Sequence, residues 1–148
     1  MSEIQEQIEL LSRVMNSPDV LPFVAPGHMF VDASTFFDAP GRYIYGDDRG
    51  LVMFGHMGEG IYEMHYLMTA RMRGPEALRR IRDAMADLFT KRDVCAITGA
   101  TPRDNLQARA VNRALGGQPI GQTIDSLGRD CIIYKLERST WARLSGAQ

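Results

Sequence analysis

The chain has 148 residues, 17 basic and 18 acidic side chains and a formal net charge of -1. This length is typical of one domain with its own apolar core, so we expect a single domain over residues 1–148. The balanced charge gives none of the basic field of a nucleic-acid-binding protein. The apolar runs are shorter than the roughly 20 residues that span a bilayer, and residues 1–15 lack the basic head of a signal peptide. We therefore predict a cytoplasmic protein with no nucleic-acid or membrane partner.

The two cysteines, Cys95 and Cys131, both lie in apolar runs that are typical of strands. They form no CxxC pair and have no histidine at the spacing of a metal site. We predict two buried free thiols, which fits a reducing compartment, and a disulfide between them is the alternative. Cys95 has no partner at a spacing that suits a nucleophile.

The first 40 residues predict a helix, a turn and a short strand. Ser2 opens an amphipathic helix whose apolar residues recur every three or four positions, and residues 16–18 end it. Pro22 and Pro26 limit residues 19–27 to a short helical turn and a loop. Residues 30–32 and 36–37 predict a short strand and a connecting turn.

Three strands are predicted next. Residues 42–46 and 51–56 flank the turn sequence Asp47-Asp48-Arg49-Gly50, which indicates a hairpin. A second turn at residues 57–60 leads into a strand over residues 61–68. The three strands should form an antiparallel meander.

Gly74-Pro75 precedes the clearest helix of the chain, residues 76–91. Proline is tolerated in a first helical turn because its missing N–H would have no partner there. The apolar stripe of this helix is predicted to face the core, and its charged residues, Arg80 among them, to face solvent.

A buried strand over residues 94–100 follows this helix. A second helix should start at Asp104 or Asn105 and end at Gly116-Gly117, before a hairpin of residues 118–124 and 131–136. Closing hairpins of this kind often pair between subunits, so a homodimer is an expectation. The tail, residues 139–148, is expected to be loose except where Trp141 docks.

Glu63 and His65 are candidates for a general base. Residues two apart on a strand project from the same face, so this carboxylate and this imidazole would lie side by side. Such a pair can take a proton from an amine or hold the orientation of the ring. The alternative is a cross-strand polar pair on an exposed face of the sheet. His56 adds no diagnostic metal-ligand spacing, and we predict no metal.

The start of the helix near Glu76 is a candidate anion site. Helix N-termini offer unpaired N–H groups and a favourable dipole to phosphate groups. Arg71 and Arg73 could add charge-assisted hydrogen bonds. The alternative is that both arginines are solvated loop residues. Tyr66 and Tyr134 are candidate acids, with the alternative that they are core residues with a polar tip.

The order of these elements resembles the GNAT superfamily of N-acetyltransferases over about residues 40–137. Arg73-Gly74 looks like the start of the family's acyl-CoA loop, R/Q-x-x-G-x-G/A. Residues 105–117 look like its N-x-x-A-x-x-h-Y-x-x-x-G-F signature. Glu63-x-His65 is similar to small GNAT-type proteins of tailed phages and prophages.

The resemblance implies an α/β (α+β) fold with a mixed, mostly antiparallel sheet of six or seven strands and helices on both faces. Residues 61–68 and 94–100 would be its central parallel pair, which in the family separates around an acyl-pantetheine arm. Acetyl-CoA is the implied co-substrate, and a small-molecule or peptide primary amine is the implied acceptor, attacking the thioester directly. Glu63 or His65 would be the base, and the implied cofactor-binding residues are Met68, Thr69, Ala70, Arg71, Met72, Arg73, Gly74 and Asn105.

The sequence also departs from the family pattern. Glu76 stands where the acyl-CoA loop has glycine or alanine, and Pro75 offers no N–H to a phosphate. Asn112 replaces the tyrosine that protonates the leaving thiolate, and Gly117 replaces an aromatic residue. These departures support a second hypothesis, a non-catalytic GNAT-fold phage or prophage protein that serves as a virion or host-interaction component. A small-ligand binding module is a third.

Overall fold

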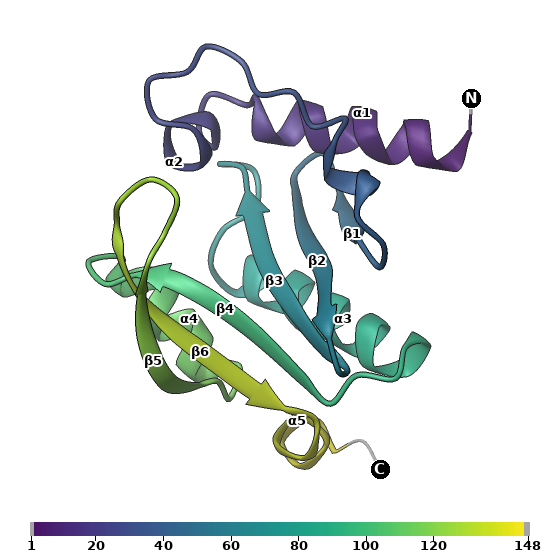
Figure 1. The fold of residues 1–148 in the computed structure, drawn as a ribbon, viewed down its shortest axis with the longest axis vertical. Helices are drawn as coiled ribbons and strands as arrows, with labels where there is room; N and C mark the ends of the chain where they lie inside the picture. Colours follow the sequence, from purple (N-terminus) through teal and green to yellow (C-terminus); the bar gives the residue numbers. More distant parts are fainter. Residues whose placement is uncertain (1, 147–148) are drawn as a thin grey trace. The chain divides into compact units, whose positions relative to one another are not determined.

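The computed structural model describes residues 2–146. Helical segments come first in this part of the chain, and strands and helices are mixed after them, as Figure 1 shows. In chain order the elements are α1 (Glu3–Met15), α2 (Leu21–Val24), the short 3-10 helix η1 (Phe36–Asp38), β1 (Tyr43–Asp47), β2 (Gly50–Gly58), β3 (Ile61–Met68), α3 (Gly74–Lys91), β4 (Ala96–Pro102), α4 (Leu106–Ala114), β5 (Gln118–Ile124), β6 (Asp130–Glu137) and α5 (Arg138–Ser145). None of these helices combines the length and the hydrophobicity that a bilayer span requires.

Over residues 2–146 the strands form one six-stranded mixed sheet in the order β1-β2-β3-β4-β6-β5. The β1–β2, β4–β6 and β5–β6 pairs are antiparallel. β3 and β4 run parallel, with Ile61 opposite Ala96 and Glu63 opposite Thr98. Parallel neighbours need a long crossover connection, and α3 supplies it. The predicted mixed sheet with a central parallel pair is confirmed, with six strands.

The described residues group into two compact units. The first unit comprises residues 2–56 and 65–87, and the second comprises residues 57–64 and 88–146. The first unit therefore holds the β1–β2 hairpin, the end of β3 and most of α3. The second holds the start of β3, β4 to β6, α4 and α5.

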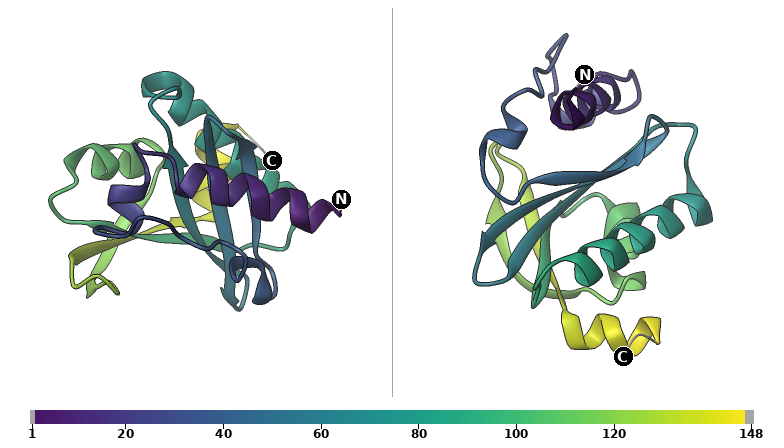
Figure 2. Two further views of the ribbon diagram at one scale, coloured as in Figure 1. Left: turned by 90° about the horizontal axis from the view of Figure 1, so that it is seen from above. Right: turned by 90° about the vertical axis from the view of Figure 1, so that its right-hand side faces the viewer.

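The core of the first unit lies under α1. Leu11 and Val14 on this helix are buried and pack in one cluster with Val20, Leu51 and Leu67. Figure 2 shows α1 on one side of the β1–β2 strands and α3 on the other. The predicted N-terminal helix is confirmed, and Ser2 is its N-cap, because its side chain accepts a hydrogen bond from the Gln5 N–H at 3.3 Å.

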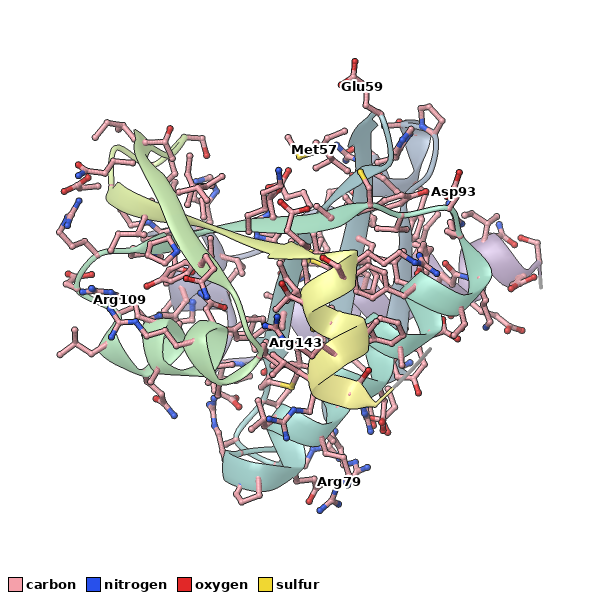
Figure 3. The ribbon with its side chains drawn as sticks, turned by 90° about the horizontal axis from the view of Figure 1, so that it is seen from below. Met57, Glu59, Arg79, Asp93, Arg109 and Arg143 are labelled. Carbon is pink, nitrogen blue, oxygen red and sulfur yellow. The ribbon has the colours of Figure 1, made fainter. Side chains whose placement is uncertain are left out.

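Two tight turns shape the predicted meander. Asp47 pairs with Gly50, so the β1–β2 turn has two central residues, Asp48 and Arg49. At the β2–β3 turn, Glu59 and Gly60 have φ angles of 55° and 76°. This left-handed pair is the geometry that a two-residue hairpin turn requires, and Figure 3 shows Glu59 at its tip.

The strand predicted at residues 30–32 is wrong. The backbone of Val31 pairs with a side chain, that of Asn16, instead of with another strand. The Asn16 amide nitrogen donates to the Val31 carbonyl at 2.9 Å, and the Val31 N–H donates to the Asn16 amide oxygen at 2.7 Å. A side-chain amide thus replaces the strand partner that sequence patterns presuppose.

Two features of the second unit also correct the sequence-based expectations. β4 begins at Ala96, two residues later than predicted, and Cys95 is exposed, with its thiol 3.2 Å from the Glu59 carbonyl. Cys131 is buried as expected. Cys95 is exposed because it lies just before β4. Its N–H donates to the Gly60 carbonyl at the β2–β3 turn, one residue before the strand begins.

The tail expected to be loose forms α5 through Ser145. Arg138 anchors this helix, because its guanidinium donates to the carbonyls of Val94 at 3.0 Å and Phe89 at 2.9 Å. Trp141 does dock: its ring stacks on Phe89 with centroids 4.5 Å apart. Residues 147–148 of the predicted tail lie outside the described residues.

The substitution Asn16→Ala should lower the free energy of unfolding by about 3 kcal/mol. It removes three partly buried hydrogen bonds, two with the Val31 backbone and one to the Ser12 carbonyl at 2.8 Å, at about 1 kcal/mol each. Urea denaturation measures the change. Gln5→Ala, an exposed position on α1, is the matched control and should be close to neutral. Equal midpoints for Asn16→Ala and the wild type would contradict the pairing.

Candidate functional site

The corner between β3 and α3 holds most of the predicted cofactor-binding residues. Thr69 fixes this corner. Its hydroxyl donates to the Arg49 carbonyl at 2.6 Å, and its N–H donates to the same oxygen at 3.0 Å. The hydroxyl also accepts the Arg71 N–H at 3.2 Å. Thr69 is buried, and its role is to hold the loop against the β1–β2 turn.

The methionines of this segment belong to the core. Met68 and Met72 are both buried. A Cβ atom added to Gly50 would lie 2.5 Å from the Met68 sulfur and 3.3 Å from the Met72 sulfur, so both side chains pack on this glycine. Toward a ligand, these two residues can offer only backbone groups.

The remaining loop residues of the prediction are exposed: Ala70, Arg71, Arg73 and Gly74. α3 begins at Gly74, whose φ of +61° is a left-handed conformation that favours glycine. Pro75 has no N–H. By helix geometry, the N–H groups of Gly74 and Glu76 are the first-turn donors that have no partner within the helix.

Glu76, the residue that most opposes a phosphate here, forms an ion pair. Its carboxylate accepts a hydrogen bond from the Arg49 guanidinium at 2.8 Å. Arg49 therefore offsets the negative charge at the start of α3. Sequence reasoning missed Arg49, because 27 residues separate the pair and the turn sequence shows no reason for the contact.

The same turn carries a second ion pair. Arg80 donates to the Asp47 carboxylate at 3.1 Å and to the Gly50 carbonyl at 2.7 Å, so the expectation that Arg80 faces solvent is wrong. The hydrogen bond from Arg80 holds the pKa of Asp47 well below its usual range. The Arg49 N–H and the charges of both guanidinium groups lower this pKa further, whereas burial opposes them. The side chain of Arg80 is only 15% exposed. α3 is thus tied to the hairpin by charge.

Two further acids contact the loop. The Arg71 guanidinium lies 3.2 Å from the Asp48 carboxylate and donates to the Asp48 carbonyl at 3.0 Å. The Ala70 N–H donates to the carboxylate of Asp19, from the connection between α1 and α2. The hydrogen bond from this N–H is the main reason why the pKa of Asp19 is lowered, and the positive charge of Arg73 lowers it further. A carboxylate of the chain therefore occupies one backbone donor of the candidate anion site.

Glu63 and His65 lie on β3 as predicted. Glu63 is half-buried and His65 is exposed. By strand alternation they share the face of Leu67, which packs in the core under α1. The structure therefore keeps an acid and an imidazole together on one strand face.

α4 places its two asparagines in structural roles. Asn105 is the N-cap, and its side-chain oxygen accepts the Ala108 N–H at 3.1 Å. Asn112 is buried and donates to the Thr101 hydroxyl on β4 at 2.8 Å. The residue in place of the family's tyrosine thus holds α4 to β4.

The two tyrosines considered as acids differ. The Tyr134 hydroxyl lies 3.4 Å from Arg109 Nε, which donates to it. Among residues 2–146, no hydrogen-bond partner reaches the buried hydroxyl of Tyr66. Burial raises the pKa of Tyr66 to about 12, so its hydroxyl keeps its proton at neutral pH.

Comparisons with known proteins address the fold. No family model matches the chain, and no curated protein matches it by sequence. It is similar in structure to aminoglycoside acetyltransferase AAC(6')-Ib in complex with coenzyme A and kanamycin, with a TM-score of 0.75, 15% identity and 95% of each chain covered. The chain has a GNAT-like fold.

Two further solved structures agree with this fold. An uncharacterised protein from Bacillus halodurans has a TM-score of 0.74 and 15% identity, with 93% of this chain and 82% of that chain covered. Mutant forms of the spermidine/spermine N-acetyltransferase SpeG from Vibrio cholerae have a TM-score of 0.60 and 17% identity, with 65% of this chain and 60% of that chain covered.

Replacing Asp47 by Asn should flatten the acid side of the stability curve. The pKa of Asp47 is lower in the folded protein than its value of about 4 in the unfolded chain. The ionised carboxylate therefore stabilises the fold above about pH 4. This stabilisation is lost as the pH falls through the folded-state pKa. Urea midpoints at pH 7 and pH 3 measure the difference. Because the carboxylate is 45% exposed, we expect a loss of only about 1 kcal/mol at pH 7.

Asp83→Asn is the matched control, because Asp83 is an exposed acid on α3. If the urea midpoints of the wild type and Asp47→Asn differ by the same amount at pH 7 and at pH 3, the charge of Asp47 does not contribute to stability.

Proposed function

We propose that the protein is an acyl-CoA-dependent N-acyltransferase that transfers an acetyl group to a primary amine of a small molecule or peptide. The observation that carries the proposal is the β3–loop–α3 segment: a strand with a parallel neighbour leads directly into a helix start surrounded by arginines. Solved acetyltransferases of similar fold, one of them in complex with coenzyme A, support it.

The helix start fits a diphosphate in part. A helix start offers the N–H groups of its first turn, here those of Gly74 and Glu76, and the helix dipole favours an anion there. Arg73 is exposed and lies one residue before the helix. Arg49 already neutralises Glu76, so a bound phosphate would not meet an isolated carboxylate.

Glu63 or His65 would act as the base. The acceptor amine must lose a proton before its nitrogen can attack the thioester carbon. Both side chains lie on the same face of β3, and either can take that proton, directly or through a water molecule. The amide bond then forms and the carbon–sulfur bond breaks, which leaves coenzyme A as the second product.

The substitution Arg73→Ala should weaken acetyl-CoA binding about tenfold or more, because one charge-assisted hydrogen bond to a phosphate is lost. Isothermal titration calorimetry measures the affinity. Arg79→Ala is the matched control: Arg79 lies on the same helix and points away from it into solvent (Figure 3). The absence of binding to the wild type at millimolar acetyl-CoA would overturn the proposal.

The substitutions Glu63→Gln and His65→Ala test the base. Whichever residue takes the proton should lose about 10²- to 10⁴-fold in kcat when replaced, with acetyl-CoA affinity and Tm close to those of the wild type. Steady-state kinetics over a panel of amines, with a melting curve for each variant, give the result. If both variants lose stability and keep their kcat, Glu63 and His65 are scaffold residues.

A second candidate function is a non-catalytic GNAT-fold protein of a phage or prophage, which acts in a virion or in host interaction. Two observations favour it. Asn112 donates a hydrogen bond to Thr101, and it has no phenol that could protonate a leaving thiolate. Asp19 already occupies the N–H of Ala70. The calorimetric titration separates the two functions, because only the enzyme requires acetyl-CoA binding.

A further inference from the structure

Four strands of the second unit carry a row of polar side chains. The register places Glu63 of β3 opposite Thr98 of β4, and Thr98 opposite Lys135 of β6. Lys135 in turn lies opposite Gln118 of β5. Figure 1 shows β4, β6 and β5 side by side. Residues opposite each other on paired strands point to the same face of a sheet, so these four side chains form one row, which we call the polar row.

The polar row lies on the opposite face of the sheet from α4. This helix packs on the face of Tyr134, because Arg109 Nε donates to the Tyr134 hydroxyl at 3.4 Å. Lys135 is the next residue of β6, and successive residues of a strand point to opposite faces. Residues 132–137 accordingly alternate between buried and less buried positions. The side chain of Lys135 is 32% exposed and Gln118 is exposed, so a ligand can reach the row.

The polar row carries opposite charges on two strands that are not neighbours. The carboxylate of Glu63 is on β3 and the ammonium of Lys135 is on β6, with Thr98 of β4 between them. Neighbouring strands lie about 4.8 Å apart, so the backbones of the two charged residues are roughly 10 Å apart. The row therefore has a negative end and a positive end, separated by a hydroxyl group.

The middle of the row has hydrogen-bonding capacity for a ligand. The Lys135 ammonium lies 3.3 Å from the carboxylate of Glu137 on its own strand, and an ammonium has three N–H donors. The Thr98 hydroxyl donates to the Met57 sulfur at 3.8 Å, and a thioether is a weak acceptor. Met57 lies close to the β2–β3 turn, as Figure 3 shows. Both groups can therefore bind a stronger acceptor than the chain gives them here.

We propose that the acceptor amine also carries an anionic group, a carboxylate or a phosphate, which Lys135 binds while the nitrogen lies at Glu63. The inference rests on the proposed function and names the class of its acceptor. Such a molecule has the polarity that complements the row. Glu63 takes the proton of the amine, the nitrogen–carbon bond forms, and the electron pair of the carbon–sulfur bond goes to sulfur. Lys135 acts away from the reacting atoms and determines specificity.

The first test compares acceptors of matched length. β-Alanine, 4-aminobutyrate and 6-aminohexanoate are compared with the corresponding alkylamines and diamines, and 3-aminopropylphosphonate replaces the carboxylate by a phosphate-like group. The kcat/KM of the best anionic acceptor should exceed that of its alkylamine and diamine about tenfold or more, because a charge-assisted contact is gained. The better of the two anion types identifies the group that Lys135 binds.

The substitution Lys135→Glu should reverse this preference, with the highest kcat/KM for a diamine, because the positive end of the row becomes negative. Lys91→Glu is the matched control: Lys91 is an exposed lysine at the end of α3 and should leave the order of acceptors unchanged. Steady-state kinetics over the same acceptors measure both variants.

A second measurement does not depend on turnover. The protein without acetyl-CoA is titrated with each amino carboxylate and with the phosphonate, and NMR shifts give the Kd. Lys135→Met should weaken binding about tenfold. Glu137→Gln should strengthen it, because this carboxylate competes with the ligand for the ammonium. The Glu137 side chain makes no capping hydrogen bond to α5, so the substitution spares that helix.

The possible failures are distinguishable. If the wild type is active and prefers alkylamines or diamines, or if Lys135→Glu keeps the wild-type order, the inference is wrong and the proposed function stands. If the wild type binds no acetyl-CoA, the proposed function fails, and the NMR titration alone decides the inference. Binding that Lys135→Met weakens then supports the polar row as a site for such amines. No binding, or equal Kd values for the wild type and Lys135→Met, overturns it.

Discussion

The carbonyl oxygen of Arg49 accepts two hydrogen bonds from Thr69, and the candidate anion site depends on this contact. It fixes the end of β3 against the β1–β2 turn and so determines where α3 begins. The side chain of the same Arg49 then reaches Glu76 in the first turn of that helix. One residue of a hairpin turn therefore sets both the position of the helix start and the charge around it.

Local patterns in the sequence predict much of the fold, because they depend on neighbours along the chain. The hairpin at Asp47–Gly50, the helix after Pro75 and the cap at Asn105 all follow from turn, proline and capping chemistry. The parallel pairing of β3 with β4 follows from their order around a crossover helix. Tail residues 138–145 are polar, and only the anchoring of Arg138 and Trp141 explains why they are helical.

The candidate site was predictable only in part, because its charges are paired through the fold. The sequence places Glu63, His65 and the loop arginines on the right elements. It does not reveal that Arg71 turns back to Asp48, that Arg80 joins the hairpin, or that Thr69 is a buried anchor. Each of these contacts joins residues at least 20 positions apart, where no local pattern carries information.

The contact between Asp19 and Ala70 joins segments 51 residues apart in the chain. An anion that takes the Ala70 N–H must first displace this carboxylate, so its net affinity is the difference between two competing contacts. The released Asp19 would leave the α1–α2 connection less restrained than before. Occupancy at the start of α3 and order in the segment after α1 are therefore thermodynamically linked, and each should report on the other.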